Sequence, residues 1–365
     1  MKILLLAEPD SANTRAWVTG LRELGCEIRI ASVRVATPSP DHQIIPLGPG
    51  WLPPRLRLLT ATGDLRQAIA DFQPDLLIGY RVTSYGYLAA RSGFHPLVIA
   101  AQNEQIIYEE HKFWPRTRLL THFAKFAISR ADLLHAWSPH IADGLRRFGA
   151  REEQIMILHR GIDTGTFIPS VTPRNHDPES PVLISTRALH AHYRHDLLLR
   201  TFAALRQHLP QARLIMVGDG PALPQLQTLA NQLGITTAVE FTGRLPAPAV
   251  AERLRQADLY VAMIDTEGLS SSLLEACACG IYPAVIDMPA SRHFPGKDSA
   301  LLLDPATSPA DGALKIADVL ADPARRQVAV AKNLAAVREK FSRDANLCRF
   351  VERYQSLSTQ IAPRS

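Results

Sequence analysis

Short apolar runs of strand length alternate with longer segments of helical period along the whole chain. In the first half the apolar runs are KILLLAE, EIRIASV, PDLLIGY, PLVIAAQ, ADLLHAW and QIMILHRG. Turn residues or charged helical segments bound each run, which is typical of βα units whose parallel strands are buried on both faces. The alternation starts again with VLISTR, ARLIMVGDG, AVEFTG, DLYVAMI, YPAVID and ALLLD. The pattern therefore predicts an α/β protein with two doubly wound, Rossmann-like domains.

A proline-rich polar stretch, FIPSVTPRNHDPESP, separates the two sets of strands and indicates a linker. The length of 365 residues also favours two domains, because one domain takes roughly 150 residues. We expect a first domain over 1–170, a second over 180–340, and a final helix within 341–365 that packs back toward the first domain. Ligands of such folds bind at the carboxyl ends of the strands, so we expect the two domains to face a cleft that holds the site.

Composition and charge exclude several classes of protein. Hydrophobic residues make up 46% and charged residues 21% of the chain, as in folded globular proteins and unlike disordered ones. The apolar runs are too short to span a membrane and no basic leader precedes the first strand, so we expect a cytoplasmic protein. The net charge of +5 is modest, and no stretch shows the run of Lys and Arg with interleaved aromatics expected of a nucleic-acid groove, which argues against nucleic acid as a partner. The four scattered cysteines are expected to be core thiols: Cys26, Cys277, Cys279 and Cys348.

The candidate chemistry is concentrated in DTEGLSSSLLEACACG, residues 265–280. LLEACACG contains good helix formers and ends at Gly280, whose tolerance of positive φ suits the position after a helix. The preceding loop follows the buried strand LYVAMI, so Ser270, Ser271 and Ser272 stand where the helix begins. Backbone N–H groups at a helix N-terminus attract anions. This stretch therefore predicts an anion site at the carboxyl end of a strand.

Two acids in the same stretch have two interpretations each. Ser272 and Glu275 fit a capping box, in which Glu275 would accept a hydrogen bond from the backbone of the cap residue. In the other interpretation Glu275 binds a ligand. Glu267 is either a solvated loop acid or an acceptor for ligand hydroxyls, since it precedes a glycine at the end of a strand.

The whole constellation resembles the nucleotide-sugar glycosyltransferases of the GT-B fold, in particular the large retaining family four, also called group 1. Members carry the spacing E-x7-E that Glu267 and Glu275 show. Similar passages are RADLLHAWSPH with GIDTGTFIP, VLISTRALHAHYRHDLLLRTFAAL, the Gly-Asp-Gly turn of LIMVGDGP, and FTGRLP. The resemblance covers nearly the whole chain. It implies transfer of a sugar from a nucleotide diphosphate donor to a hydroxyl acceptor, with retention of the anomeric configuration.

The resemblance also implies roles for individual residues. Arg187 would bind the diphosphate, for which a planar guanidinium that keeps its proton is well suited. Glu267 would bind sugar hydroxyls and Glu275 the ribose hydroxyls, while Arg194 is the nearest candidate for the lysine that members usually carry. The implied donor-binding residues are Arg187, Arg194, Gly243, Arg244, Leu245, Glu267, Gly268, Leu269, Ser270, Ser271 and Glu275, and the catalytic pair is Arg187 and Glu267.

The first domain departs more from the family pattern. LLLAEPDSANTRAW has no glycine-rich turn after the first strand, although SANTRAW matches members in which Asn13 lies where the first helix starts. Tyr80 stands where members often carry a histidine, and Asn103 precedes a helix. Asn13, Tyr80 and Asn103 are therefore candidates for acceptor contacts, with packing or capping as the alternative for each.

No metal ion and no other cofactor are expected. The triplet Asp265-Thr266-Glu267 resembles the acidic motif with which the other main glycosyltransferase fold holds a metal on the donor. Here Arg187 and the helix N-terminus already offer positive charge to the diphosphate, and Glu267 is assigned to the sugar. The loop histidines His190, His192 and His195 have a spacing that does not favour zinc.

One further segment, EEHKFWPRTRLLTHFAKFAISR, combines aromatic and basic residues and suits an interfacial helix on an anionic membrane. These residues are Phe113, Trp114 and Phe123 with Lys112, Arg116, Arg118, Lys125 and Arg130. The alternative is that the aromatics belong to the core and the cations to a solvated face.

Two other functions also remain open. A nucleotide-sugar epimerase would need acid and base groups on both faces of the sugar, and a non-catalytic binding subunit would keep the donor features alone.

Overall fold

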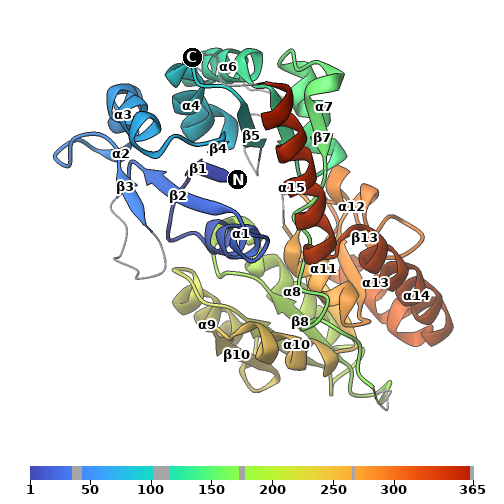
Figure 1. Cartoon of the computed structure of the whole chain (residues 1–365). Helices are drawn as coiled ribbons and strands as arrows, with labels where there is room; N and C mark the ends of the chain where they lie inside the picture. The colour runs from blue at the N-terminus through green and yellow to red at the C-terminus, as the bar shows by residue number, and fades with distance from the viewer. Residues whose placement is uncertain (35–42, 102–114, 172–176, 265–267, 362–365) are drawn as a thin grey trace. The chain divides into compact units, whose positions relative to one another are not determined.

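The computed structural model describes residues 1–34, 43–101, 115–171, 177–264 and 268–361 (Figure 1). The chain divides into two compact units. Unit 1 comprises Met1–Arg160 with Asp344–Ser365, and unit 2 comprises Gly161–Arg343. Each unit contains one parallel sheet with helices between its strands, so the predicted pair of doubly wound α/β domains is confirmed.

The sheet of unit 1 has the order β3-β2-β1-β4-β5-β6-β7, and every neighbouring pair is parallel. Its elements are β1 (Lys2–Leu6), α1 (Ala12–Glu23), β2 (Glu27–Ser32), β3 (Ile44–Pro46), α2 (Pro54–Thr60), α3 (Thr62–Phe72), β4 (Leu76–Tyr80), the π-helical turn Arg81–Gly86, α4 (Tyr87–Ser92), β5 (Leu97–Ala101), α6 (Pro115–Arg130), β6 (Leu133–Ala136), α7 (Pro139–Arg147), the 3-10 turn Glu152–Gln154, β7 (Ile155–Ile157) and most of α15 (Arg343–Gln360).

The sheet of unit 2 has the order β10-β9-β8-β11-β12-β13 and is also parallel throughout. Its elements are β8 (Val182–Thr186), the 3-10 turn Ala191–Tyr193, α8 (His195–Leu205), β9 (Arg213–Val217), α9 (Leu223–Gln232), the 3-10 turn Thr236–Ala238, β10 (Val239–Gly243), α10 (Ala247–Arg255), β11 (Leu259–Ala262), α11 (Ser271–Ala278), β12 (Tyr282–Ile286), α12 (Pro289–His293), β13 (Leu301–Leu303), α13 (Pro309–Ala321) and α14 (Pro323–Lys340).

All twelve predicted apolar runs contain a strand of one of the two sheets. Central strands such as β4 and β5 are buried at every position, which explains why they are continuously apolar rather than alternating. The strand that the pattern did not predict is β3. It has three residues, none of them fully buried, and lies at the edge of its sheet, so it carries too short an apolar signal.

The final helix α15 contributes to the core of unit 1. Phe350 packs edge-on against Trp17, with ring centroids 4.7 Å apart, and Tyr354 is fully buried. A Cβ at Gly20 would lie 2.3 Å from Cδ1 of Leu347, so α1 needs a glycine where α15 approaches it. Burial of these aromatic side chains ties α15 to the helix that follows β1.

The observed division of the chain differs from the predicted one at residues 161–170. These residues belong to unit 2 rather than to the first domain. The reason is that Ile162 pairs with Ser342 in an isolated parallel bridge and is buried with Phe167 in the core of unit 2. The boundary therefore precedes the proline-rich stretch that suggested a linker.

The prediction that all four cysteines are core thiols is wrong for Cys348. Cys26, Cys277 and Cys279 are buried, and burial raises the pKa of each thiol. Cys348 is exposed because it lies on the outer side of α15, whose opposite side carries Leu347 and Phe350 into the core.

Candidate functional site

In unit 2 the order of strands reverses between β8 and β11. The connections after these two strands leave toward opposite sides, which opens a crevice at the carboxyl edge of the sheet between them. Arg187 directly follows β8, and Ser270 lies on the connection from β11 to α11. Two of the residues that the sequence singled out are thus brought to the topological switch point.

Arg187 is held tightly at this position. Arg187 is only 7% exposed, and its Nη1 donates a hydrogen bond to Oγ of Ser270. The guanidinium carbon lies 4.4 Å from the centre of the Tyr193 ring, a cation–π geometry. Sequence reasoning missed Tyr193, although an aromatic residue six positions after the arginine is a visible signal.

The Gly-Asp-Gly turn after β9 supports the arginine loop. Gly218 has a φ of +146°, and a Cβ there would lie 2.2 Å from the carbonyl oxygen of Arg187. The backbone N–H of Leu189 donates to the carbonyl of Asp219 over 3.0 Å. The turn needs glycine because it touches the backbone of the loop that carries Arg187.

The same turn also positions the loop after β10. The N–H of Gly218 donates to the carbonyl oxygen of Gly243 over 3.0 Å, and Gly243 itself has a positive φ of 70°. Leu245 packs against the core of unit 2, whereas Arg244 is exposed. The loop of Gly243, Arg244 and Leu245, to which the resemblance gives a donor-binding role, therefore lies at the same edge of the sheet as Arg187.

The helix α11 begins earlier than the capping-box interpretation required. Its N-cap is Ser270, whose Oγ accepts a hydrogen bond from the N–H of Leu273 over 3.4 Å. The capping box formed by Ser272 and Glu275 is therefore wrong, because Glu275 lies in the second turn. Glu275 is half-buried and stands one turn after Ser271 on the same face of the helix. The predicted end of the helix is confirmed, since Gly280 has a φ of +80°.

The residues just before α11 are buried. Gly268 and Leu269 are both buried, and Leu269 packs into the core of unit 2. The Leu269 side chain is thus turned inward, which leaves its backbone for any ligand contact. Glu267 lies outside the described residues, together with Asp265 and Asn103.

Arg194 and His195 make local contacts within the described part of unit 2. Arg194 adopts a left-handed φ of 51° just before α8, and its Nε lies 3.6 Å from Oδ1 of Asp196. His195 is buried and its Nε2 donates to the carbonyl of Ala188 over 3.1 Å. Burial lowers the pKa of His195, so it is neutral near pH 7. The diphosphate role of Arg194 remains a prediction.

Unit 1 has its own switch point, between β1 and β4. A cavity of about 20 Å³ lies there, lined by Glu8, Ser11, Thr14, Tyr80, Arg81 and Tyr85. Tyr80, a predicted acceptor-side residue, ends β4 and is 5% exposed. Asn13 is half-buried in the first turn of α1. Thr14 lies in the passage SANTRAW that resembles the family, whereas sequence reasoning missed Glu8 and Arg81, which belong to no such passage.

Comparison with known proteins identifies the family. The model for Glycosyltransferase Family 4 matches residues 14–166, and the model for Glycosyl transferases group 1 matches residues 171–335. The two matches lie one in each half of the chain and together cover most of it. This chain belongs to the group 1 glycosyltransferases of the GT-B fold.

Individual relatives are more distant. A GDP-mannose-dependent alpha-(1-6)-phosphatidylinositol monomannoside mannosyltransferase from Mycolicibacterium smegmatis is 31% identical over 46% of this chain and 47% of its own length. The sulfoquinovosyl transferase SQD2 of Arabidopsis thaliana is 24% identical over 72% of this chain and 53% of its own length. This chain thus spans about half the length of these curated relatives.

Solved structures agree on the fold. A sucrose-phosphate synthase from Thermosynechococcus elongatus superimposes with a TM-score of 0.80 at 18% identity, covering 99% of this chain and 100% of the other. The Anabaena protein HepE in complex with UDP superimposes with a TM-score of 0.78 at 17% identity, covering 98% and 100%. Both confirm the GT-B architecture of two Rossmann-like domains.

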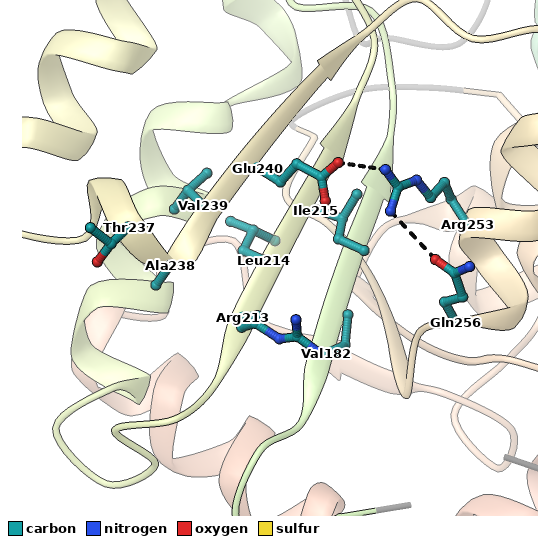
Figure 2. A pocket seen from close by; sticks show the side chains of 10 residues that line it. All are labelled: Val182, Arg213, Leu214, Ile215, Thr237, Ala238, Val239, Glu240, Arg253 and Gln256. Carbon is teal, nitrogen blue, oxygen red and sulfur yellow. Dashed lines mark hydrogen bonds and ion pairs between the residues drawn. The ribbon is translucent and has the colours of Figure 1, made fainter. Parts of the chain in front are cut away.

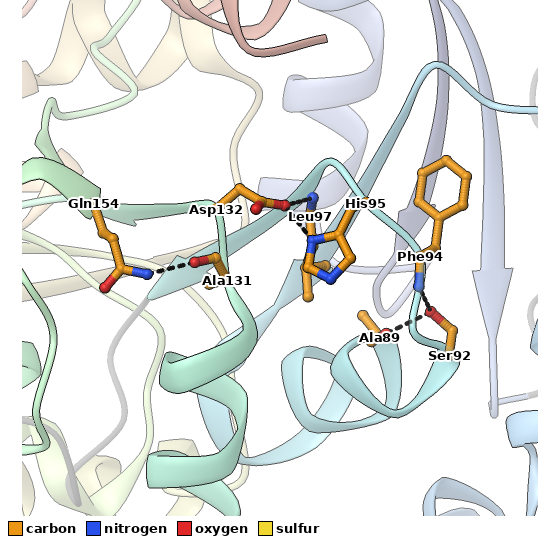
Figure 3. Close-up of polar contacts among 8 residues, drawn as sticks. All are labelled: Ala89, Ser92, Phe94, His95, Leu97, Ala131, Asp132 and Gln154. Carbon is orange, nitrogen blue, oxygen red and sulfur yellow. Dashed lines mark hydrogen bonds and ion pairs between the residues drawn. The ribbon is translucent and has the colours of Figure 1, made fainter. Parts of the chain in front are cut away.

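Two larger cavities lie at the amino ends of the strands, away from both switch points. The first, of about 260 Å³, lies near the starts of β8, β9 and β10 (Figure 2). Glu240 Oε1 pairs there with Nη2 of Arg253 over 2.6 Å. The second, of about 710 Å³, lies near the starts of β5 and β6, where Asp132 accepts hydrogen bonds of 2.7 Å from His95 and from the N–H of Leu97 (Figure 3). The first contact joins α10 to β10, the second joins loop residues near the starts of β5 and β6, and neither includes a predicted site residue.

The helix α6 carries the described part of the aromatic and basic segment. Phe123 stacks on Tyr87 with ring centroids 4.1 Å apart, so this aromatic packs within unit 1, as the alternative interpretation holds. Arg118, Lys125 and Arg130 are exposed. Outside the described side chains lie Lys112, Phe113, Trp114 and Arg116. No helix in the described ranges is both long and apolar enough to cross a bilayer.

Proposed function

We propose that this protein transfers a sugar from a nucleotide diphosphate donor to a hydroxyl acceptor. The observation that carries the proposal is the buried Arg187, hydrogen-bonded to Ser270 at the N-terminus of α11. Guanidinium and helix N-terminus are both positive, so a diphosphate beside them is stabilised by two sources at once. Membership of the group 1 family supports the proposal, as does the structure of HepE in complex with UDP-glucose.

The reaction needs stabilisation of charge on the leaving group. As the bond between the anomeric carbon and the diphosphate oxygen breaks, negative charge develops on the diphosphate next to Arg187. The acceptor oxygen forms the new bond to the anomeric carbon and gives its proton to the departing phosphate oxygen. This route requires no base from the protein and places the acceptor on the face that the diphosphate leaves, which gives retention. Glu267 and Glu275 bind the hydroxyls of sugar and ribose.

Donor binding tests the assignment of Arg187. Affinity for UDP and for GDP is measured by calorimetry for the wild type, Arg187→Lys and Glu275→Gln. We expect Arg187→Lys to weaken binding of the preferred nucleotide about tenfold, because lysine keeps the charge and loses the planar fork. Glu275→Gln should weaken it at unchanged thermal stability, since the structure gives Glu275 no place in the helix cap. Equal affinity in all three proteins would contradict both the diphosphate role of Arg187 and the ribose role of Glu275.

Product analysis tests the reaction itself. Incubation with a panel of nucleotide-sugars should release free nucleotide diphosphate, at undiminished rate after dialysis against EDTA. The product should keep the anomeric configuration of the donor by NMR. Activity that vanishes on chelation and returns with Mn²⁺ would contradict metal independence and implicate Asp265. Interconversion of sugars without release of nucleotide would indicate an epimerase, and binding without either reaction a non-catalytic subunit.

The acceptor is proposed to be presented at an anionic membrane, which the exposed cations of α6 would contact. The lipid acceptor in the name of the Mycolicibacterium relative supports this view. Sedimentation with anionic and neutral vesicles should show binding to the anionic ones, weakened in the double variant Arg118→Gln, Lys125→Gln. A matched control changes two exposed cations of α14, Lys332→Gln and Arg338→Gln. Equal loss in both double variants would show an effect of net charge and not of α6.

A further inference from the structure

The loop that enters α2 presents a tryptophan to solvent. Trp51 is 81% exposed, and Leu56 and Leu59, which are one turn apart on α2, are 48% and 41% exposed. A single exposed leucine is ordinary, but a bare tryptophan and two leucines within nine residues form a patch. We call Trp51, Leu56 and Leu59 the α2 patch. It follows the edge strand β3, whereas the switch point of unit 1 lies between β1 and β4.

A buried arginine fixes the backbone on both sides of Trp51. Arg57 lies on the inner side of α2, and its guanidinium donates hydrogen bonds to three carbonyl oxygens, those of Val33, Gly50 and Leu52. Gly50 and Leu52 are the two neighbours of Trp51 in the chain. The indole is therefore exposed although the backbone beside it is tightly bonded, as expected of a side chain that meets a partner outside the chain.

The helices around the α2 patch are rich in cations. In the sequence, α2, α4 and α6 contain seven lysines and arginines and no aspartate or glutamate. The neighbouring α3 adds one cation and two acids, so the four helices carry eight cations against two acids. Among the exposed cations are Arg55 on α2 and Arg118 and Lys125 on α6. This surface of unit 1 therefore complements a negatively charged partner.

Contacts through α4 connect the α2 patch to α6. Nη1 of Arg91, on α4, donates to the carbonyl oxygen of Leu59 over 2.6 Å, and the Arg91 guanidinium lies 5.8 Å from the centre of the Tyr87 ring. Tyr87 in turn stacks on Phe123 of α6. Side chains of α2, α4 and α6 pack on the same core cluster of unit 1 (Figure 1). The apolar patch and the cations of α6 thus belong to one continuous surface.

The small area of the α2 patch favours a membrane over a protein partner. Its three side chains expose on the order of 350 Å² in all, whereas each partner in a stable protein interface contributes roughly 800 Å². A bilayer requires no matching surface. An indole ring lies at the level of the headgroups, leucines enter the boundary of the acyl chains, and cations pair with anionic headgroups.

We propose that the α2 patch is an apolar anchor that inserts into the interface of an anionic membrane. The inference rests on the proposed presentation of the acceptor at a membrane and names a second, apolar part of the contact. It predicts how the two parts respond to salt. Salt screens the contacts of the cations with headgroups, whereas it leaves the insertion of Trp51, Leu56 and Leu59 in place.

Vesicle sedimentation of the full chain tests the anchor. The vesicles contain phosphatidylcholine with about one third phosphatidylglycerol, and binding is measured at low and at high salt. We expect Trp51→Ala to lower the partition coefficient about tenfold at either salt concentration, because it removes most of the exposed apolar area of the patch. The double variant Arg118→Gln, Lys125→Gln should lose binding chiefly at low salt. Thermal stability of Trp51→Ala should stay near that of the wild type, since the exposed indole packs little within the chain.

Tryptophan emission reports insertion directly. Trp51→Phe keeps an aromatic anchor and should bind nearly as the wild type does. Vesicles should shift the emission of the wild type to shorter wavelength, and the shift should be absent in Trp51→Phe. A persistent shift of the same size in Trp51→Phe would show that another tryptophan enters the bilayer and would overturn the proposal.

Leu56→Ala and Leu314→Ala form a matched pair, because the two leucines are 48% and 53% exposed and Leu314 lies on α13 of unit 2. Only Leu56→Ala should weaken vesicle binding. The anchor is refuted if the wild type binds no vesicles, if Trp51→Ala binds as the wild type does, or if Leu314→Ala loses as much as Leu56→Ala. Self-association of the wild type without vesicles, lost in Trp51→Ala, would make the patch an interface between copies and also refute it. UDP binding and sugar transfer are measured separately, so a protein that inserts through Trp51 without transferring sugar would contradict the proposed function alone.

Discussion

The ring of Tyr193 should strengthen nucleotide diphosphate binding by Arg187, because it packs against the guanidinium. Replacement of the ring tests this. The guanidinium carbon of Arg187 lies 4.4 Å from the ring centre, and Arg187 is 7% exposed. A cation–π contact is worth about 1–2 kcal/mol at a largely desolvated site. At about 1.4 kcal/mol for each factor of ten, Tyr193→Leu should weaken nucleotide diphosphate binding about five- to thirtyfold. Tyr193→Phe keeps the ring and should stay within about twofold of the wild type.

Calorimetric titration with UDP and GDP measures the effect, and a double-mutant cycle locates it. In an Arg187→Met background the ring has no cation to hold, so Tyr193→Leu should cause no further loss. Thermal unfolding of each variant checks that the loop after β8 remains folded. Equal affinity of Tyr193→Leu and wild type would refute the positioning role. An undiminished effect of Tyr193→Leu in the Arg187→Met background would show that Tyr193 acts on the ligand directly.

Two further predictions concern stability. Gly218→Ala should destabilise unit 2 by about 3 kcal/mol in chemical denaturation, because the new Cβ would lie 2.2 Å from the Arg187 carbonyl oxygen. The control is Gly234→Ala, which also has a positive φ but has no atom within 4 Å of the new Cβ. It should lower the free energy of unfolding by only roughly 1 kcal/mol. His135 has its pKa lowered by burial from 6.5 to about 3, so the unfolded state binds a proton that the folded state does not, and stability falls as pH falls from about 6.5 toward 3. Between pH 7 and 5 this amounts to about 2 kcal/mol, and His135→Gln should remove that part of the pH dependence; parallel curves for variant and wild type would contradict it.

The fold could be predicted from the sequence because its strands are nearly all central. A strand such as β5, buried at every position, must be apolar throughout, and turn residues mark its ends. The edge strand β3 and the boundary at Gly161 could not be predicted. The boundary depends on the bridge between Ile162 and Ser342, which are far apart in the chain, and no local pattern encodes such a contact.

The candidate donor site could be predicted only where a motif marks it. Arg187 and the serines at the start of α11 follow strands in recognisable passages, and the structure brings Arg187 and Ser270 into contact. The sequence predicts that α11 begins among the three serines but does not decide which of them is the N-cap, because they are nearly equivalent as caps by local chemistry. Tertiary contact with Arg187 favours Ser270, the first of the three. Local sequence does not contain that preference.

The two switch points differ in how their charged side chains are arranged. At the one in unit 2, Arg187 and the N-terminus of α11 add positive potential, which suits a diphosphate that gains charge as it leaves. At the one in unit 1, Glu8 offsets part of the charge of Arg34 and Arg81, and the buried groups are hydroxyls. The charge that a diphosphate needs is therefore buried in unit 2, where Arg187 is held against the N-terminus of α11. Each doubly wound sheet offers the same crevice, so the side chains after its strands, and not the fold, determine which substrate it takes.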